Sequence, residues 1–193
     1  MKTLIIGCGG IGSNLIPELA ELVEKGQIPI EVEIDFFDAD MVETKQLKFQ
    51  RFELEDIGQT KSFALAKKFE YMKGKPIRVT KEKQLEGYDM IILCVDNEPT
   101  RELVVKYCWK HNKEFIDLRA TGSSVFAMPK GISLEYDLKF IDSSDKKEYS
   151  CQDKADLDKG RIQLGNRMIA VRGAQMFLNH IRGQTNKMYM DTI

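Results

Sequence analysis

The chain has 193 residues, of which 42% are hydrophobic and 31% charged, as in an ordinary globular protein with a sizeable core. Its 29 basic and 30 acidic side chains nearly cancel, so the charge balance predicts neither a nucleic acid nor an anionic membrane as partner. The apolar residues after Met1-Lys2 stop at Gly7, too early for a signal peptide, and no apolar run is long enough to span a membrane. Four scattered cysteines without a Cys-x-x-Cys pair indicate reduced thiols, and we therefore expect a cytoplasmic protein.

The first half of the chain alternates between predicted strands and helices. A short apolar run predicts a buried strand over Lys2–Ile6, and the periodic apolar residues after a glycine-rich turn predict a helix over Ile11–Val23. β-Branched and aromatic residues predict a second strand over Ile30–Phe37. After a polar loop, an apolar stripe predicts a helix over Lys61–Met72, and Ile77–Thr80 is predicted to be a short third strand.

The second half continues this alternation. The almost continuous apolar run Tyr88–Val95 predicts a strand covered on both faces, followed by a helix over Thr100–His111 and a strand over Glu114–Leu118. Ser124–Met128 and Gly131–Tyr136 are predicted to pair as a hairpin across Pro129-Lys130.

The last part of the chain combines a long polar segment with a final helix. Residues 140–161 are polar and lack periodicity, which predicts a mobile crossover loop, and an amphipathic helix is expected over Asn166–Ile181. Strands that alternate with helices predict the α/β class, with a Rossmann-like, mostly parallel sheet and helices on both faces. We expect one nucleotide-binding domain over residues 1–193.

The turn between the first strand and the first helix has the spacing Gly7-x-Gly9-x-x-Gly12. In such a turn the first glycine permits the tight bend, the second lets the backbone approach a phosphate, and the third lets the helix lie close to the strand. Asp38 comes at the carboxyl end of the second predicted strand, where an acid accepts hydrogen bonds from both ribose hydroxyls. These residues predict a nucleotide pocket, and by themselves they leave NAD and ATP open.

Further short stretches favour ATP over NAD. Together with the glycine turn, they make the chain resemble the ThiF/MoeB/HesA family, the bacterial relatives of ubiquitin-activating enzymes. The resemblance runs from Leu4 to about Gly183. The stretches that carry it are Gly7-Cys8-Gly9-Gly10-Ile11-Gly12-Ser13, Asp38-x-Asp40-x-Val42-Glu43, Asp56-Ile57-Gly58-x-x-Lys61, Asp96-Asn97-x-x-x-Arg101 and Gly173-Ala174-Gln175.

The resemblance implies ATP-dependent adenylation of the C-terminal glycine of a small ubiquitin-like or sulfur-carrier protein, with release of pyrophosphate, and a homodimer. It implies that Asp38 holds the ribose, that Lys61 reaches the phosphates, and that Asp96 handles Mg²⁺ or orients the triphosphate. The resemblance also implies that Gly10 and Asp40, in these stretches, and Gln50, in the segment after Asp40, bind the nucleotide.

Simpler roles stand beside these assignments. Lys61 fits equally a solvated lysine in the first turn of a helix, and Asp96-Asn97 fits a helix cap. Arg101 is expected to make a structural ion pair rather than to touch substrate.

The segment after Asp40 departs from the family pattern, because Gln46 stands where an asparagine is expected and Phe49 where an arginine is expected. Arg51 or Lys48 is then the candidate for the missing catalytic cation. The alternative function is an ATP-binding regulatory or scaffolding module without turnover. An NAD-dependent oxidoreductase is a third hypothesis, which leaves Lys61 and Asp96 without a role.

Cys151 lies in the predicted loop, where related enzymes can carry a cysteine that forms a thioester or acyl-disulfide with the activated partner. The resemblance therefore makes Cys151 a candidate for a later transfer step, and an incidental loop cysteine is the alternative. Cys8, Cys94 and Cys108 are predicted to be small core residues, and the chain has no pair of cysteines spaced to bind zinc.

Overall fold

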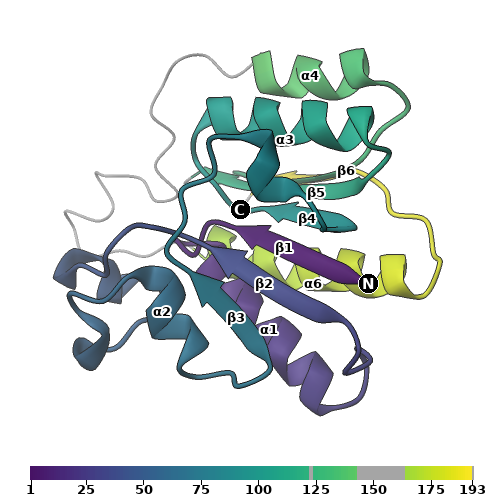
Figure 1. The fold of residues 1–193 in the computed structure, drawn as a ribbon. Coiled ribbons are helices and arrows are strands. Elements are labelled where there is room, and N and C mark those ends of the chain that lie inside the picture. The colour runs from purple at the N-terminus through teal and green to yellow at the C-terminus, as the bar shows by residue number, and fades with distance from the viewer. Residues whose placement is uncertain (122–123, 143–163, 193) are drawn as a thin grey trace.

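A seven-stranded β-sheet with the strand order β3-β2-β1-β4-β5-β6-β7 forms the centre of the protein (Figure 1). The computed structural model describes residues 1–121, 124–142 and 164–192. The neighbouring pairs among β1 to β5 are parallel, whereas β6 runs antiparallel to both of its neighbours, β5 and β7. The strands are β1 (Lys2–Ile6), β2 (Glu33–Phe37), β3 (Met72–Lys75), β4 (Met90–Leu93), β5 (Glu114–Thr121), β6 (Ser124–Pro129) and β7 (Tyr189–Thr192).

Helices cover both faces of this sheet, which confirms the predicted Rossmann-like α/β fold. Figure 1 shows α1 (Gly12–Glu24) and α6 (Gly165–Ile181) on one face, and α3 (Glu98–Lys110) and α4 (Leu134–Asp142) on the other. α2 (Lys61–Ala66) packs beside β3. Three short 3₁₀ helices complete the described elements, and they span Thr44–Lys48, Leu54–Asp56 and Glu82–Leu85.

The two layers of helices give the sheet a core on each face. Ile5 packs in the core formed with α1 and α6, while its neighbours Leu4 and Ile6 pack in the core formed with α3 and α4. Every residue of β4 is buried. This explains the continuous apolar run in the sequence, since a parallel strand with helices on both sides buries both rows of side chains.

Gly173 explains how closely α6 approaches the sheet. A Cβ at this position would lie 2.4 Å from Cδ1 of Leu118 on β5, so a larger residue would push the helix away. The short stretch Asp56-Ile57-Gly58 is likewise structural in this fold. Asp56 is buried and accepts hydrogen bonds from the Glu53 N–H and the Lys68 ammonium, while Gly58 has a φ of +80°.

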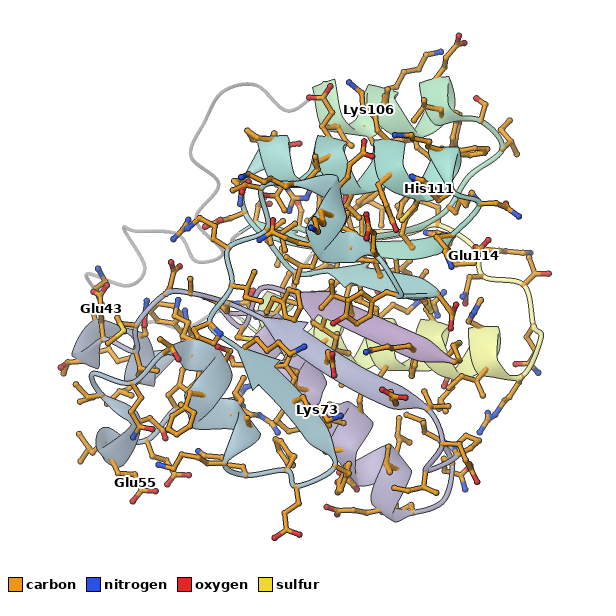
Figure 2. All side chains as sticks on the ribbon, in the orientation of Figure 1. Glu43, Glu55, Lys73, Lys106, His111 and Glu114 are labelled. Atoms are coloured by element: carbon orange, nitrogen blue, oxygen red, sulfur yellow. The ribbon has the colours of Figure 1, made fainter. Side chains whose placement is uncertain are left out.

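The third strand differs from the prediction, because it spans Met72–Lys75 and not Ile77–Thr80, and α2 ends at Ala66 instead of Met72. The reason is tertiary. Met72 and its neighbours pair with β2 at the edge of the sheet, and Gly74 lets α2 come close, since a Cβ there would lie 2.1 Å from a backbone oxygen of that helix. Lys73 lies on this edge strand (Figure 2), and a strand with lysines at an edge has a weak local signal.

The predicted hairpin is also wrong in one of its two strands. β6 matches Ser124–Met128, but its partners are β5 and β7, and the chain after Gly131 forms α4. The carboxylate of Asp137 holds α4 against α3, since it accepts hydrogen bonds from Trp109 Nε1 at 2.7 Å and from the Gly131 N–H at 3.1 Å. Residues 140–142, expected in the loop, belong to this helix, and residues 143–163 lie outside the described part. Among the described helices, none is long and apolar enough to cross a bilayer.

Candidate nucleotide-binding site

The glycine turn lies between β1 and β4, where the order of the strands in the sheet reverses. This switch point is the usual place for a ligand crevice in an open α/β sheet. Gly7 has a φ of +96°, and a Cβ there would lie 2.6 Å from the backbone oxygen of Cys94. A Cβ at Gly12 would lie 1.9 Å from the backbone oxygen of Gly7. Both positions therefore require glycine, one for the bend and one for the close approach of α1 to the turn.

Gly9 and Gly10 form the open part of the same turn and line a pocket of about 300 Å³. The nearest atom to a Cβ at Gly9 is Nε2 of Gln50, 4.0 Å away, so this glycine faces open space rather than packing. A Cβ at Gly10 would instead meet the side-chain amide of Asn166 at 2.4 Å. The free backbone of the turn thus faces the pocket at the start of α1, where helix N–H groups attract an anion.

Asp38 lines this pocket at the end of β2, and the backbone holds its carboxylate in place. Oδ2 accepts a hydrogen bond from the Cys8 N–H at 2.7 Å, and Oδ1 accepts one from the Asp40 N–H at 2.8 Å. Burial raises the pKa of Asp38 above its usual range, although these two hydrogen bonds and the nearby Lys61 act in the opposite direction. The carboxylate has lone pairs left to accept hydrogen bonds from a ligand.

Lys61 lies at the first position of α2, and only 5% of this residue is exposed. Its Nζ is 3.8 Å from Oδ2 of Asp40 and makes no hydrogen bond to any residue that the structure describes. A buried ammonium that lines a pocket, with one long ion pair and no hydrogen bond within the described residues, is suited to bind an anion. The alternative of a solvated surface lysine is therefore wrong.

Arg78 is a pocket residue that the sequence did not reveal. Its Nη2 lies 2.5 Å from Oδ1 of Asp40, so Asp40 pairs with both cations of the pocket. Ile77 and Val79 line the same wall. The sequence predicts a strand over Ile77–Thr80, whereas in the structure this segment follows β3 and lies beside the pocket. Its place at the site depends on where β3 ends, which only the tertiary structure decides.

Arg51 does not line the pocket. Its Nη2 lies 3.4 Å from Oε1 of Glu18 on α1, and its backbone N–H donates to Ser13 Oγ. Gln50 and Phe49 do line the pocket, and the Oε1 atom of Gln50 is buried without a hydrogen-bond partner in the described part of the chain. The structure thus places an unpaired amide oxygen and an aromatic ring where the family pattern has a glutamine and an arginine.

Asp96 and Asn97 follow β4, and both line the pocket. Asn97 caps α3 as predicted, since its side chain accepts a hydrogen bond from the Thr100 N–H at 3.0 Å. Asp96 is exposed and makes no hydrogen bond or ion pair within the described ranges. The expected structural ion pair of Arg101 is confirmed, with Nε 3.1 Å from Oδ1 of the buried Asp117.

The pocket therefore gathers most of the predicted binding residues at the carboxyl ends of β1, β2 and β4. Its charged side chains are three carboxylates and two cations. No cluster of three or more His, Cys, Asp or Glu side chains among the described residues provides a metal site by itself. The pocket members named by the sequence are Gly7, Gly9, Gly10, Asp38, Asp40, Gln50, Lys61 and Asp96.

The described cysteines lie in the interior, as predicted. Cys8, Cys94 and Cys108 are buried, and none of the three forms a disulfide with another described cysteine. Burial raises the pKa of the Cys108 thiol to about 12 and raises that of Cys8 as well. Such thiols stay protonated near neutral pH and are poor nucleophiles. Cys151 lies outside the described residues.

Comparisons with known proteins agree with this geometry. The model of the ThiF family matches residues 1–188. No curated protein sequence gives a significant match. The fold is similar to that of E. coli MccB solved with ATP, with a TM-score of 0.66 and 18% identity over 99% of this chain and 62% of that chain.

Two further solved structures have the same fold. E. coli MccB with AMPCPP and MccA has a TM-score of 0.67 and 18% identity over 100% of this chain and 63% of that chain. PaaA has a TM-score of 0.70 and 16% identity over 100% of this chain and 60% of that chain. The chain thus spans less than two thirds of the length of these proteins. With the family model matched over nearly the whole sequence, the chain belongs to the ThiF family.

Proposed function

We propose that this protein binds ATP in the pocket at the glycine turn and adenylates the C-terminal carboxylate of a peptide or small protein. The observation that carries the proposal is the buried ammonium of Lys61, which lines the pocket beside Asp38, makes no hydrogen bond within the described residues and has only a long ion pair with Asp40, at 3.8 Å. A triphosphate needs such a cation, whereas the Rossmann fingerprint of a dehydrogenase does not include one.

The residues of the pocket fit the parts of ATP. The carboxylate of Asp38 is fixed by two backbone N–H groups and would accept hydrogen bonds from the ribose hydroxyls. The backbone at Gly9, which has open space in front of it, would approach the phosphates. Lys61 and Arg78 would exchange part of their pairing with Asp40 for contacts with phosphate oxygens.

The proposed reaction transfers the adenylyl group to the substrate. A carboxylate oxygen of the substrate attacks the α-phosphorus, the bond to the bridging oxygen of the β-phosphate breaks, and pyrophosphate leaves. The attacking carboxylate is already ionised at neutral pH, so the site needs no general base. Catalysis consists of holding the reactants in line and stabilising the negative charge that develops on the phosphates, a role suited to Lys61.

Asp96 is the residue we propose to hold Mg²⁺. Its carboxylate is exposed at the pocket and unpaired within the described ranges, and Mg²⁺ binds with one or two carboxylates plus phosphate oxygens. The pocket has three carboxylates and two cations, so it carries an excess negative charge. This excess favours binding of a further cation, which would have to be present before a triphosphate enters. When bound, Mg²⁺ supplies charge neutralisation on the phosphates.

The related structures support this proposal, since MccB is solved with ATP and with AMPCPP together with MccA. We further propose that the partner is small and ubiquitin-like, or a sulfur carrier, and that the protein acts as a homodimer. A later transfer through Cys151 is also proposed. In this step the Cys151 thiol would attack the acyl adenylate, forming a thioester and releasing AMP. Replacement of Cys151 with serine should then preserve pyrophosphate release and abolish the thioester-linked adduct detected by mass spectrometry, and an unchanged adduct would exclude this step.

A regulatory or scaffolding role is the second candidate. It is favoured by Phe49 in the pocket and by the position of Arg51, whose guanidinium pairs with Glu18 outside the pocket. An arginine directed at the reacting phosphate accounts for a large part of the rate in other phosphoryl-transfer enzymes. In this alternative, ATP binds and no adenylate forms.

The test begins with calorimetric titration of the protein with Mg-ATP and, separately, with NAD⁺. We expect binding of Mg-ATP only, lost in Asp38→Ala and weakened about tenfold or more in Lys61→Met, which keeps the aliphatic chain and removes the charge. Lys67→Met is the matched control, because Lys67 lies just after the same helix and its Nζ contacts Gln59. Pyrophosphate exchange dependent on a C-terminal peptide would support adenylation, and ATP binding without any exchange across a broad peptide panel would favour the regulatory role. Binding of NAD⁺ instead would exclude both.

A further inference from the structure

A second pocket of about 280 Å³ adjoins the nucleotide pocket, and the two share Val95 and Asp96 as lining residues. It lies at the carboxyl ends of β4 and β5 and beside the start of β6. Ile11 in the glycine turn forms part of its wall. A group bound in the second pocket is therefore next to the place where the proposed function puts the phosphates.

Much of the lining of this second pocket is apolar. The contributing side chains come from four separate elements of the chain, and one of them, Met190 on β7, is 72% exposed. A partly apolar pocket of this kind beside a polar one is typical of a site that binds a ligand with an apolar part. The apolar side chains are Ile11, Val125, Phe126, Phe140 and Met190.

The two arginines of the pocket are already engaged. Arg101 and Arg119 both pair with the fully buried Asp117, at 3.1 Å and 2.6 Å respectively. Arg101 also binds Glu98 and the backbone oxygen of Val95, and Arg119 also donates to the backbone oxygen of Phe140 at 2.8 Å. These guanidinium groups are held as structure and are not free to receive an acidic side chain.

Besides the hydroxyl groups of Thr121 and Ser124, the second pocket is lined by two carboxylates that are not fully paired within the described residues. Oε1 of Glu98 pairs with Arg101 at 2.8 Å, but Oε2 is buried and has no hydrogen-bond partner among residues 1–121, 124–142 and 164–192. Asp96 on the shared wall is also unpaired within these ranges. A buried carboxylate oxygen without a partner is costly, so the missing partner is expected to be a hydrogen-bond donor, and a cation fits best.

We infer that the second pocket selects the substrate, and that it binds a peptide segment whose last residues include a bulky apolar side chain and a lysine or arginine. The apolar side chain would lie on the surface formed with Phe126 and Met190, and the cation would pair with the carboxylate of Glu98, whose side chain is 30% exposed and would turn its Oε2 toward the ligand. The terminal carboxylate would point past Asp96 into the nucleotide pocket. This inference rests on the proposed function, and it excludes a substrate that ends in small residues alone, since glycines would leave the apolar surface and Glu98 without a partner.

The test uses fluorescein-labelled heptapeptides that end in alanine. A leucine and a lysine are placed in every order among the three preceding positions, and matched peptides carry glutamate in place of lysine or glycine in place of leucine. Binding is measured by fluorescence anisotropy without nucleotide. For at least one order, we expect the leucine–lysine peptide to bind about tenfold more tightly than its glutamate and glycine counterparts.

Variants of Glu98 then identify the recognising group. Glu98→Gln should remove the preference for lysine over glutamate, and Glu98→Lys should invert it. Glu102→Lys is the matched control and should leave the preference unchanged, because Glu102 lies one turn further along α3 and pairs on the surface with Lys106. Met190→Ser should reduce the preference for leucine over glycine, and its exposure makes it harmless to the fold. Mg-ATP binding by the same samples confirms that each variant is folded.

The outcomes separate this inference from the proposed function. Selective peptide binding with no pyrophosphate exchange would keep the inference about the second pocket and remove the adenylation. Exchange with peptides of every composition at similar rates, equal binding of all peptides, or binding of none of them would overturn the inference. A preference for glutamate in the wild-type protein would overturn it as well.

Discussion

Two pockets lie side by side at the carboxyl edge of one sheet, and they are built in different ways. The first, over β1, β2 and β4, is made by a glycine turn, backbone N–H groups and charged side chains such as Asp38 and Lys61. The second, over β4, β5 and β6, is mostly apolar, and its arginines are held by one buried carboxylate. The difference shows that backbone geometry shapes much of the first pocket, whereas side chains from several elements shape the second.

Removing the buried carboxylate beneath the second pocket should have the largest effect. Asp117 is fully buried and pairs with both Arg101 and Arg119, so Asp117→Asn leaves Arg119 without a carboxylate partner among the described residues and leaves Arg101 with Glu98 alone. We expect the free energy of unfolding to fall by about 3–5 kcal/mol in urea titrations. Asp89→Asn, in a solvent-exposed pair with Lys113, should cost less than about 1 kcal/mol. Equal losses in the two variants would contradict the distinction.

The first pocket should be most sensitive at Gly12. In Gly12→Ala the new Cβ would press on the backbone oxygen of Gly7, which has no freedom to move aside, and we expect a loss of about 3 kcal/mol together with loss of ATP binding. Gly26→Ala is a suitable control, since Gly26 has a φ of +66° but free space around it, and about 1 kcal/mol of backbone strain is expected. Chemical denaturation and calorimetry measure both quantities. Retained ATP affinity in Gly12→Ala would show that the turn is not the phosphate site.

Gly10 gives a smaller and reversible effect. A Cβ at Gly10 would meet only the side chain of Asn166 among its nearest neighbours, so Gly10→Ala should cost about 1–3 kcal/mol. Both polar atoms of the Asn166 amide are buried without partners in the described residues, and Asn166→Ala alone should therefore be neutral or stabilising. The double variant should recover most of the stability. A double-mutant cycle with no coupling would place the clash elsewhere.

The smallest expected effect concerns the pH dependence that Asp38 adds. Because burial raises its pKa in the folded protein, the folded state binds the proton more tightly than the unfolded chain does. The contribution of Asp38 to the free energy of unfolding should thus fall as the pH rises from about 3.9 through the raised pKa of the folded state. In urea titrations over this pH range, the free energy of unfolding of the wild type should fall with rising pH relative to that of Asp38→Asn. Parallel pH profiles would show that the carboxylate is not desolvated.

The site shows where sequence reasoning works for this protein. Gly7, Gly12, Asp38 and Lys61 stand at fixed distances from the ends of predicted strands and helices, and the fold brings them together as expected. Their roles in catalysis stay predictions. Arg78 was missed because its place depends on where β3 ends, and β3 is an edge strand that forms through pairing with β2. The sequence did not reveal the second pocket either, because most of its apolar side chains come from β6, β7 and α4, which meet only in the folded protein.

The sequence by itself determined the α/β class, the glycine turn, the acid at the end of the second strand and the family of the protein, because each depends on residues close together in the chain. The tertiary structure alone decided that Arg51 pairs with Glu18, that Asp117 holds two arginines, and that Oε2 of Glu98 is left without a partner. The physical reason is that pairing and burial depend on contacts between residues far apart in sequence. Local propensity and periodicity carry no information about such contacts.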